Sequence, residues 1–216
     1  YSRYNSHGTL FYDASPFRSS DHDPVLVSFG AQAAEPVATT TKAKTRDRLV
    51  RYGEDVTVTV AVRAEGVVPS VEVFDRDDVV GSAELDADGR ARIDVTGLKP
   101  GKHRLTVRYA GSDAAAPSQA RRALTVLVLP GATKVAFDVD RDGRGVDVEV
   151  TGRGFTPEGA VFVLVDGRLA GGGRLDDGHV EVEVGKQRRG VHVYTVLYLG
   201  SDVAAPDGAS RVVRVR

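Results

Sequence analysis

Strict alternation of apolar and polar residues is the strongest local pattern in this chain. It is clearest over residues 56–62 (Val-Thr-Val-Thr-Val-Ala-Val) and residues 179–184 (His-Val-Glu-Val-Glu-Val). Because side chains alternate between the two faces of a β-strand, both stretches predict strands with one buried face. Residues 71–74 and 161–165 predict further strands, and no stretch has a convincing helical period. The pattern therefore predicts an all-β chain.

Turn residues separate the predicted strands. Asp-Gly pairs stand at residues 88–89, 142–143, 166–167 and 177–178, and Lys99-Pro100-Gly101 forms another turn signal. Asp-Gly is typical of tight hairpin connections, because Asp and Gly tolerate the positive φ angles that these turns require. We therefore expect short antiparallel strands joined by hairpins.

An internal repeat gives the domain organisation. Residues 101–117 realign with residues 190–206, 89 positions later, and 11 of the 17 residues are identical. Residues 56–60 match residues 146–150 at nearly the same offset. A period near 90 residues is the size of a small β-sandwich, and about seven short strands per copy favour the immunoglobulin-like kind. The predicted fold is two tandem immunoglobulin-like β-sandwiches, preceded by a short extended segment.

The boundaries follow from composition. We assign residues 46–129 to the first sandwich and residues 130–216 to the second. Residues 31–45 are small, polar and proline-bearing, which predicts a loosely extended linker. Residues 1–30 are turn-rich with one apolar run, and a single strand cannot bury its own faces. We therefore expect residues 1–30 to be the C-terminal remnant of another domain.

Two segments resemble known families. Residues 97–111 (Gly-Leu-Lys-Pro-Gly-Lys-His-Arg-Leu-Thr-Val-Arg-Tyr-Ala-Gly) resemble the bacterial Ig-like repeats of secreted and surface proteins. Residues 20–25 (Ser-Asp-His-Asp-Pro-Val) resemble the last motif of the endonuclease/exonuclease/phosphatase superfamily. With the upstream Tyr and Arg residues, residues 1–29 are similar to the C-terminal end of secreted bacterial extracellular nucleases in that superfamily.

The second resemblance implies a catalytic role for two residues. His22 would act on the scissile phosphate or the attacking water, and Asp21 would orient the site and its divalent metal, magnesium or manganese. Nucleic acid would be the substrate of the parent enzyme. The family's metal-binding Glu and its other His and Asn residues lie upstream of this motif and are not located in this chain. Since phosphodiester hydrolysis needs a metal or cationic group as well as a base, we expect this fragment alone to be inactive.

Composition limits the alternatives. The 216 residues carry a formal net charge of -1, which gives no whole-chain argument for nucleic acid or an anionic membrane. The absence of Cys excludes disulfides and thiolate zinc sites. No apolar run approaches the roughly 18 residues of a membrane span. The resemblances favour a secreted or cell-surface location.

Charged residues form two candidate binding segments. Lys42, Lys44, Arg46 and Arg48 stand at alternate positions and would project from one face of an extended strand. They suit a nucleic acid or acidic glycan, or they protect a solvated edge strand, which is the preferred interpretation. The run from Asp138 to Glu149 fits the calcium-loop pattern D-x-D-x-D-G-x5-E. Its metal-ligating candidates are Asp138, Asp140, Asp142 and Glu149.

The calcium interpretation has a structural alternative. An EF-hand needs flanking helices, whereas the flanks here predict strands, so we prefer a polar hairpin over a calcium site. His103 and His192 occupy equivalent places in the two copies, and we expect them to link a loop to a strand. The acidic cluster at residues 75–78 is expected to be a solvated turn.

Two functions remain open at this point. The first is the C-terminal region of a secreted metal-dependent nuclease or phosphodiesterase, with non-catalytic Ig-like domains as spacers or as binders of a cell-wall or surface ligand. The second is a cell-surface or adhesion module that binds protein or glycan, with no catalytic parent.

Overall fold

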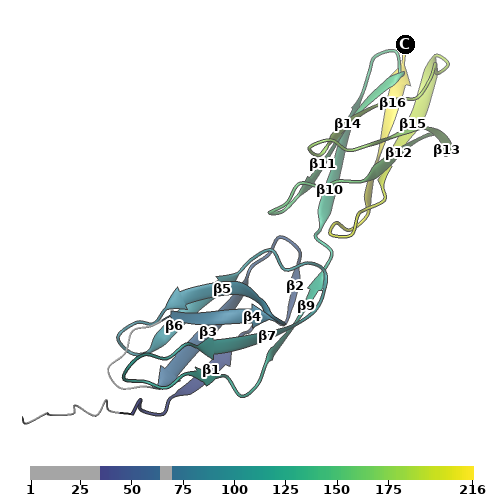
Figure 1. Ribbon diagram of the computed structural model, residues 1–216. Coiled ribbons are helices and arrows are strands. Elements are labelled where there is room, and N and C mark those ends of the chain that lie inside the picture. The colour runs from purple at the N-terminus through teal and green to yellow at the C-terminus, as the bar shows by residue number, and fades with distance from the viewer. Residues whose placement is uncertain (1–34, 64–69) are drawn as a thin grey trace, which may run out of the picture. The chain divides into compact units, whose positions relative to one another are not determined.

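The computed structural model describes residues 35–63 and 70–216. Within these residues it contains strands and no helix, and the strands form two separate sandwiches (Figure 1). No helix that could cross a membrane occurs in this part of the chain. The predicted all-β fold with two tandem immunoglobulin-like sandwiches is confirmed.

The first sandwich pairs a three-stranded sheet with a larger one. The three-stranded sheet has the order β1-β3-β6, and the other has the order β2-β9-β7-β4-β5, with the short β8 beside β7. All pairings are antiparallel except that of β2 with β9. The strands are β1 (Thr40–Lys44), β2 (Leu49–Arg51), β3 (Val56–Arg63), β4 (Ser70–Asp75), β5 (Asp78–Glu84), β6 (Arg90–Val95), β7 (Gly101–Tyr109), β8 (Ser118–Gln119) and β9 (Leu124–Leu129).

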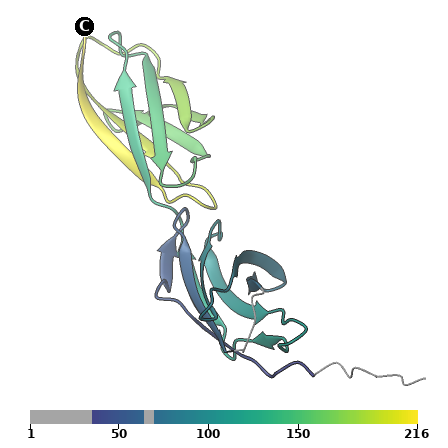
Figure 2. The same cartoon turned by 90° about the vertical axis from the view of Figure 1, so that its left-hand side faces the viewer.

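The second sandwich repeats this arrangement with fewer strands. Its three-stranded sheet has the order β10-β11-β14 and faces a four-stranded sheet of order β13-β12-β15-β16 (Figure 2). The strands are β10 (Thr133–Val139), β11 (Gly145–Gly152), β12 (Ala160–Val165), β13 (Arg168–Arg174), β14 (His179–Glu183), β15 (Gly190–Tyr198) and β16 (Asp207–Val215). The second copy has the expected seven strands, whereas the first has nine, because it also contains the short β2 and β8.

Each sandwich has its own valine-rich core. In the first, Val58, Val73 and Val107 are completely buried, and in the second, Val148 and Val163 are too. These residues come from the inward positions of the alternating segments, so the period of two in the sequence directly selects the core. β-branched side chains suit this position because they pack well on a pleated surface.

The Asp-Gly signals mark real turns. Asp166 and Gly167 have φ angles of 51° and 77°, and Asp177 and Gly178 have φ angles of 48° and 81°. Such paired positive φ angles define the tight hairpin turn whose twist matches the flanking strands. The turns predicted at these two positions are confirmed: the first closes the hairpin of β12 and β13, and the second is a tight turn between β13 and β14, which belong to different sheets.

The predicted linker is too long at its C-terminal end. β1 lies within residues 31–45 and pairs with β3 along its whole length. Thr41 is only 3% exposed, and its hydroxyl lies 2.7 Å from the Ser118 hydroxyl. The small, polar composition suggested a linker, but Thr has high β-propensity, and the alternation from residue 40 onward supplies an edge strand.

Candidate functional site

The predicted catalytic pair cannot be placed. His22 and Asp21 lie outside the described residues, and their roles stay predictions. The candidate sites that can be built are therefore the carboxylate hairpin, the duplicated His residues and the basic segment.

The carboxylate hairpin connects β10 to β11. Asp140 donates its backbone N–H to the Gly145 carbonyl, and the Gly143 N–H returns to the Asp140 carbonyl. The Gly143 carbonyl accepts a 2.8 Å hydrogen bond from the buried Tyr194 hydroxyl. A Cβ on Gly143 would stand 2.7 Å from that hydroxyl, and its φ of 72° also favours glycine. The preferred hairpin interpretation of this segment is thus confirmed.

The four candidate calcium ligands are spread along this hairpin. Asp138 binds Arg211 at 2.6 Å, and Glu149 lies 3.7 Å from His179. Asp142 accepts a hydrogen bond from the Arg144 backbone N–H. Within residues 35–63 and 70–216, no group of three His, Cys, Asp or Glu side chains is arranged to hold a metal ion. Calcium binding here stays a prediction, which a calcium titration can test.

The duplicated His residues form the best-defined polar contacts. In the first sandwich, His103 Nδ1 lies 2.6 Å from Asp75 Oδ2, and His103 Nε2 lies 2.7 Å from the Lys99 carbonyl oxygen. The other Asp75 oxygen accepts a longer bond from the Arg104 backbone N–H. This first Asp–His bridge links the end of β4 and the loop before β7 to β7 itself.

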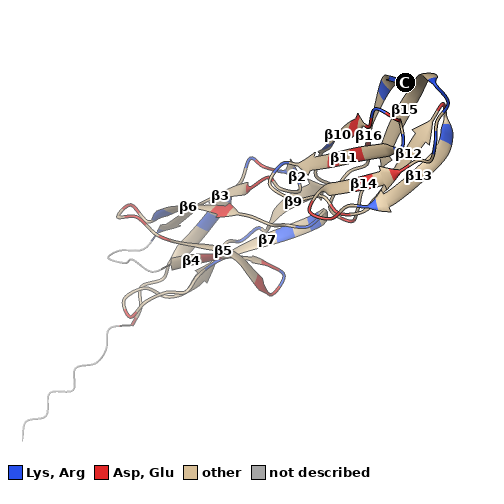
Figure 3. Ribbon diagram, turned by 90° about the horizontal axis from the view of Figure 1, so that it is seen from above, with Lys and Arg blue, Asp and Glu red and all other residues tan. Residues whose placement is uncertain are grey.

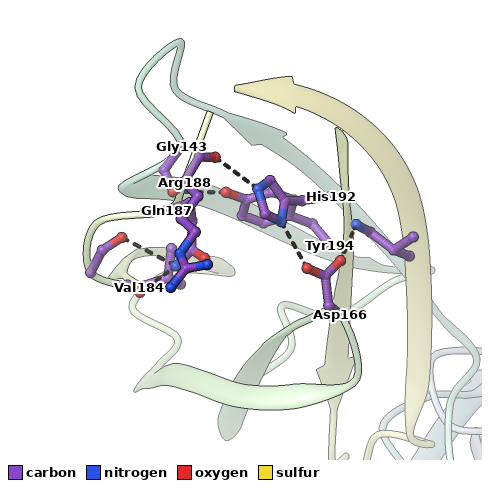
Figure 4. Close-up of polar contacts among 9 residues, drawn as sticks. Gly143, Asp166, Val184, Gln187, Arg188, His192 and Tyr194 are labelled. Carbon is purple, nitrogen blue, oxygen red and sulfur yellow. Dashed lines mark hydrogen bonds and ion pairs between the residues drawn. The ribbon is translucent and has the colours of Figure 1, made fainter. Parts of the chain in front are cut away.

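The second Asp–His bridge has the same connections. His192 Nδ1 lies 2.7 Å from Asp166 Oδ2, and Nε2 lies 2.8 Å from the Arg188 carbonyl oxygen (Figure 4). The Val193 N–H donates to Asp166 Oδ1 at 2.9 Å. The hydrogen bond to Asp166 raises the pKa of His192, with the Arg188 carbonyl adding to the effect. The Val193 N–H and then His192 lower the pKa of Asp166.

These contacts decide what the two imidazoles can do. A carbonyl oxygen only accepts hydrogen bonds, so in each ring Nε2 is the donor to the carbonyl, and Nδ1 faces the carboxylate. Both nitrogens of each ring already have a protein partner, so metal binding or proton transfer through either ring would require breaking one of these hydrogen bonds. The expectation that His103 and His192 link a loop to a strand is confirmed.

The two bridges take their carboxylate from different backbone positions. Asp75 is the last residue of β4 and pairs with Leu105 on β7. At the matching place in β12, Val165 pairs with Tyr194 and is buried. The carboxylate of the second copy comes from the next residue, Asp166, in the hairpin turn. Sequence analysis therefore found both His residues but missed their partners, since a direct superposition of the repeats does not align the two Asp residues.

The basic segment lies at the edge of the first sandwich. Lys42, Lys44, Arg46 and Arg48 are all exposed, as their alternate spacing predicts. The segment after β1 is held to β3, because the Asp47 carboxylate accepts a hydrogen bond from the Thr57 backbone N–H. Beside it is a hollow of about 390 Å³, lined by Lys44, Thr45, Arg46, Asp47, Thr57, Thr59 and Arg92. The cations thus belong to an ordered, solvated sheet edge.

Comparison with known proteins gives one family match, to the first sandwich. Residues 37–128 match the family model described as bacterial Ig-like domain (group 3). No curated protein matches the chain. Among solved structures, the fibronectin(III)-like modules of Clostridium thermocellum CbhA are 20% identical with a TM-score of 0.32, over 81% of this chain and 94% of that one.

Two further structures have similar values. The Yersinia pseudotuberculosis adhesin InvE is 15% identical with a TM-score of 0.33, over 82% of this chain and 59% of that one. Titin domains A168–A170 are 12% identical with a TM-score of 0.46, over 82% of this chain and 65% of that one. In both cases the match spans less than two thirds of the other chain. These values support no inference about function. The family match runs from Val37 to Val128 and covers nearly all of the first sandwich, which is therefore similar to a bacterial Ig-like domain.

Proposed function

We propose that the two sandwiches are a non-catalytic binding or spacing region of a secreted or cell-surface protein. One observation carries the proposal. The pairs Asp75–His103 and Asp166–His192, which by residue type could be catalytic, instead connect loops to strands by hydrogen bonds. His103 and His192 each place both ring nitrogens within 2.8 Å of an oxygen acceptor. Both histidines therefore have a structural role. The outward faces of the sheets are exposed and can bind a partner.

The arrangement of charge supports a binding role. Exposed Lys and Arg residues lie on β1, β3 and β6 of the first sandwich, and exposed Asp and Glu residues lie on β10, β11 and β14 of the second. Figure 3 colours the Lys and Arg positions of the ribbon blue and the Asp and Glu positions red. Charge contributes little to the stability of an exposed sheet face, so single-sign clusters point to contacts outside the sandwich.

A hydrolysis assay tests the non-catalytic part of this proposal. The 216-residue chain is incubated with double-stranded DNA, RNA and an aryl phosphodiester, each with magnesium or manganese. We expect no turnover above that of a matched His22→Ala preparation. Metal-dependent cleavage by the chain that is lost in His22→Ala would contradict the proposal.

A second candidate function rests on the motif at residues 20–25. Its Ser-Asp-His-Asp-Pro-Val sequence favours a parent that is a secreted metal-dependent nuclease, with the sandwiches as its non-catalytic C-terminal region. In that case the complete natural protein should cleave nucleic acid with magnesium or manganese, and His22→Ala should abolish cleavage. A complete protein without such activity would leave the adhesion or surface module as the function.

A further inference from the structure

The outward face of the β1-β3-β6 sheet is strongly basic. Lys42, Lys44, Arg63, Arg90 and Arg92 are exposed on it, and Asp94 is the one carboxylate among its outward strand residues. We call this surface the basic face; its formal charge, five cations less one carboxylate, is +4. The pairing register places Lys44, Thr59 and Arg92 in one row across the three strands. The cations therefore share a single surface, although they come from three separate segments.

The outward face of the β10-β11-β14 sheet has the opposite sign. Its exposed carboxylates are Asp138, Asp147, Glu149, Glu181 and Glu183, and Lys134 is the one Lys or Arg among its outward strand residues. We call this surface the acidic face; its formal charge, five carboxylates less one cation, is -4. The two corresponding sheets of the repeat thus carry charges of equal size and opposite sign.

The charge distribution of the acidic face is not explained by the stability of its own sandwich. Asp138, Asp147 and Glu181 stand directly opposite one another in a single row across β10, β11 and β14. Like charges in directly opposed positions destabilise a sheet. Arg211 from β16 offsets Asp138 alone within this row. A partner that brings cations to the row would relieve the repulsion, and the basic face has that chemistry.

We propose that the basic face of one molecule docks on the acidic face of a second copy of this chain. The inference rests on the proposed role as a binding region and names its partner. Both faces are exposed three-stranded antiparallel surfaces of similar strand length, so they are matched in outline as well as in charge. Because each copy carries both faces, the contact is heterologous and can be repeated from one copy to the next.

Size and charge predict a weak and salt-sensitive contact. Three strands at about 4.8 Å spacing and six residues at about 3.3 Å rise cover roughly 14 by 20 Å on each partner. This footprint is far below the roughly 800 Å² per partner of a stable complex. Complementary charge raises the rate of encounter and sets the orientation, and salt screens it. We therefore expect reversible association at high protein concentration.

Sedimentation equilibrium of the full chain tests the proposal. At about 0.01 M salt, where the screening length is about 30 Å, the weight-average mass should rise above the 23.0 kDa monomer as concentration increases. At about 1 M salt, with a screening length of about 3 Å, it should return to the monomer value. A chain that stays monomeric at low salt overturns the proposal.

Charge-reversal variants identify the surfaces involved. A basic-face variant carries Lys42→Glu, Lys44→Glu and Arg92→Glu, and an acidic-face variant carries Glu149→Lys, Glu181→Lys and Glu183→Lys. Each variant alone should be monomeric at low salt, and an equimolar mixture should associate again, because one has two acidic faces and the other two basic faces. A circular dichroism spectrum of each variant, compared with that of the wild type, checks that both are folded.

A matched control makes the same change in net charge at positions outside the basic face. Lys102→Glu, Arg121→Glu and Arg122→Glu alter the net charge equally at exposed positions away from the basic face, and this control should associate like the wild type. Association lost equally in the control, or no association in the mixture, overturns the proposal. So does a wild-type chain that stays monomeric but binds duplex DNA through Lys42, Lys44 and Arg92, since its partner is then nucleic acid. The hydrolysis assay is separate, so cleavage there contradicts the proposed function without altering this result.

Discussion

The two sandwiches share their interior and differ in the face they present. Both pair a three-stranded sheet with a larger one, and both fasten a loop to a strand by an Asp–His bridge. Their three-stranded sheets nevertheless carry formal charges of about +4 and -4 on the outward side. Packing and buried hydrogen bonds restrict the interior, whereas the exposed face is free to vary. The comparison indicates that the common scaffold gives stability, and on the proposed function the outer faces carry specificity.

Buried valines at matching positions give the largest expected effect. Val107 and Val196 are completely buried in separate cores. Val107→Ala should lower the free energy of unfolding of the first sandwich by about 2 kcal/mol, because two methyl groups are lost and a cavity remains. Val196→Ala should do the same to the second. Calorimetry should show one transition shifted in each variant; an equal shift of the whole profile in both would show that the sandwiches do not unfold independently.

The second Asp–His bridge should make the stability of its sandwich depend on pH. The pKa of His192 is raised above its ordinary 6.5, so its stabilising effect is complete below pH 6.5 and is lost as pH rises through the folded-state value. The lowered pKa of Asp166 adds an effect that is present above pH 3.8 and is lost as pH falls through its folded-state value.

The difference in melting temperature between wild type and His192→Gln measures this effect. It should be greatest between about pH 4 and pH 6.5 and should shrink toward pH 9. His103→Gln, which leaves the second bridge intact, is the control and should alter the first sandwich alone. A difference for His192→Gln that is constant from pH 5 to pH 9 would contradict the charged form of the bridge.

Calcium should give the smallest effect. Asp138, Asp142 and Glu149 each contact a different residue, so we expect the melting temperature of the second sandwich to stay the same when calcium is added. Thermal denaturation with calcium and with chelator measures this. A rise in melting temperature that Asp140→Ala abolishes would instead establish the calcium site that the D-x-D-x-D-G pattern predicts.

The sequence predicted those parts of the fold that depend on local patterns. Alternation identified the strands around Val58 and Val182, and the pairs Asp166-Gly167 and Asp177-Gly178 identified turns, because side-chain period and positive φ are local properties. The alternate cations at residues 42–48 predicted an edge strand, and β1 lies there in part, whereas the small, polar composition placed the end of the linker too late, at residue 45.

The candidate sites depended on contacts between distant residues, which explains what was missed. His103 meets an Asp 28 residues before it, and His192 meets one 26 residues before it. The unequal spacing hides the pairing from an alignment of the repeats. The two charged faces emerge only when register places Asp147 beside Glu181, or Thr59 beside Arg92. Alternate spacing predicted that the cations at residues 42–48 share one face. It gave no information about which residues of the neighbouring strands lie beside them.

The most direct test of the central claim is an NMR titration of the full chain. Backbone amide shifts are compared between dilute and concentrated protein at low salt, and again at high salt. We predict concentration-dependent shifts in β1, β3 and β6 and in β10, β11 and β14, all suppressed by salt. Shifts confined to the opposite sheets, such as β7 and β15, or shifts unaffected by salt, would contradict a common scaffold that presents two complementary faces.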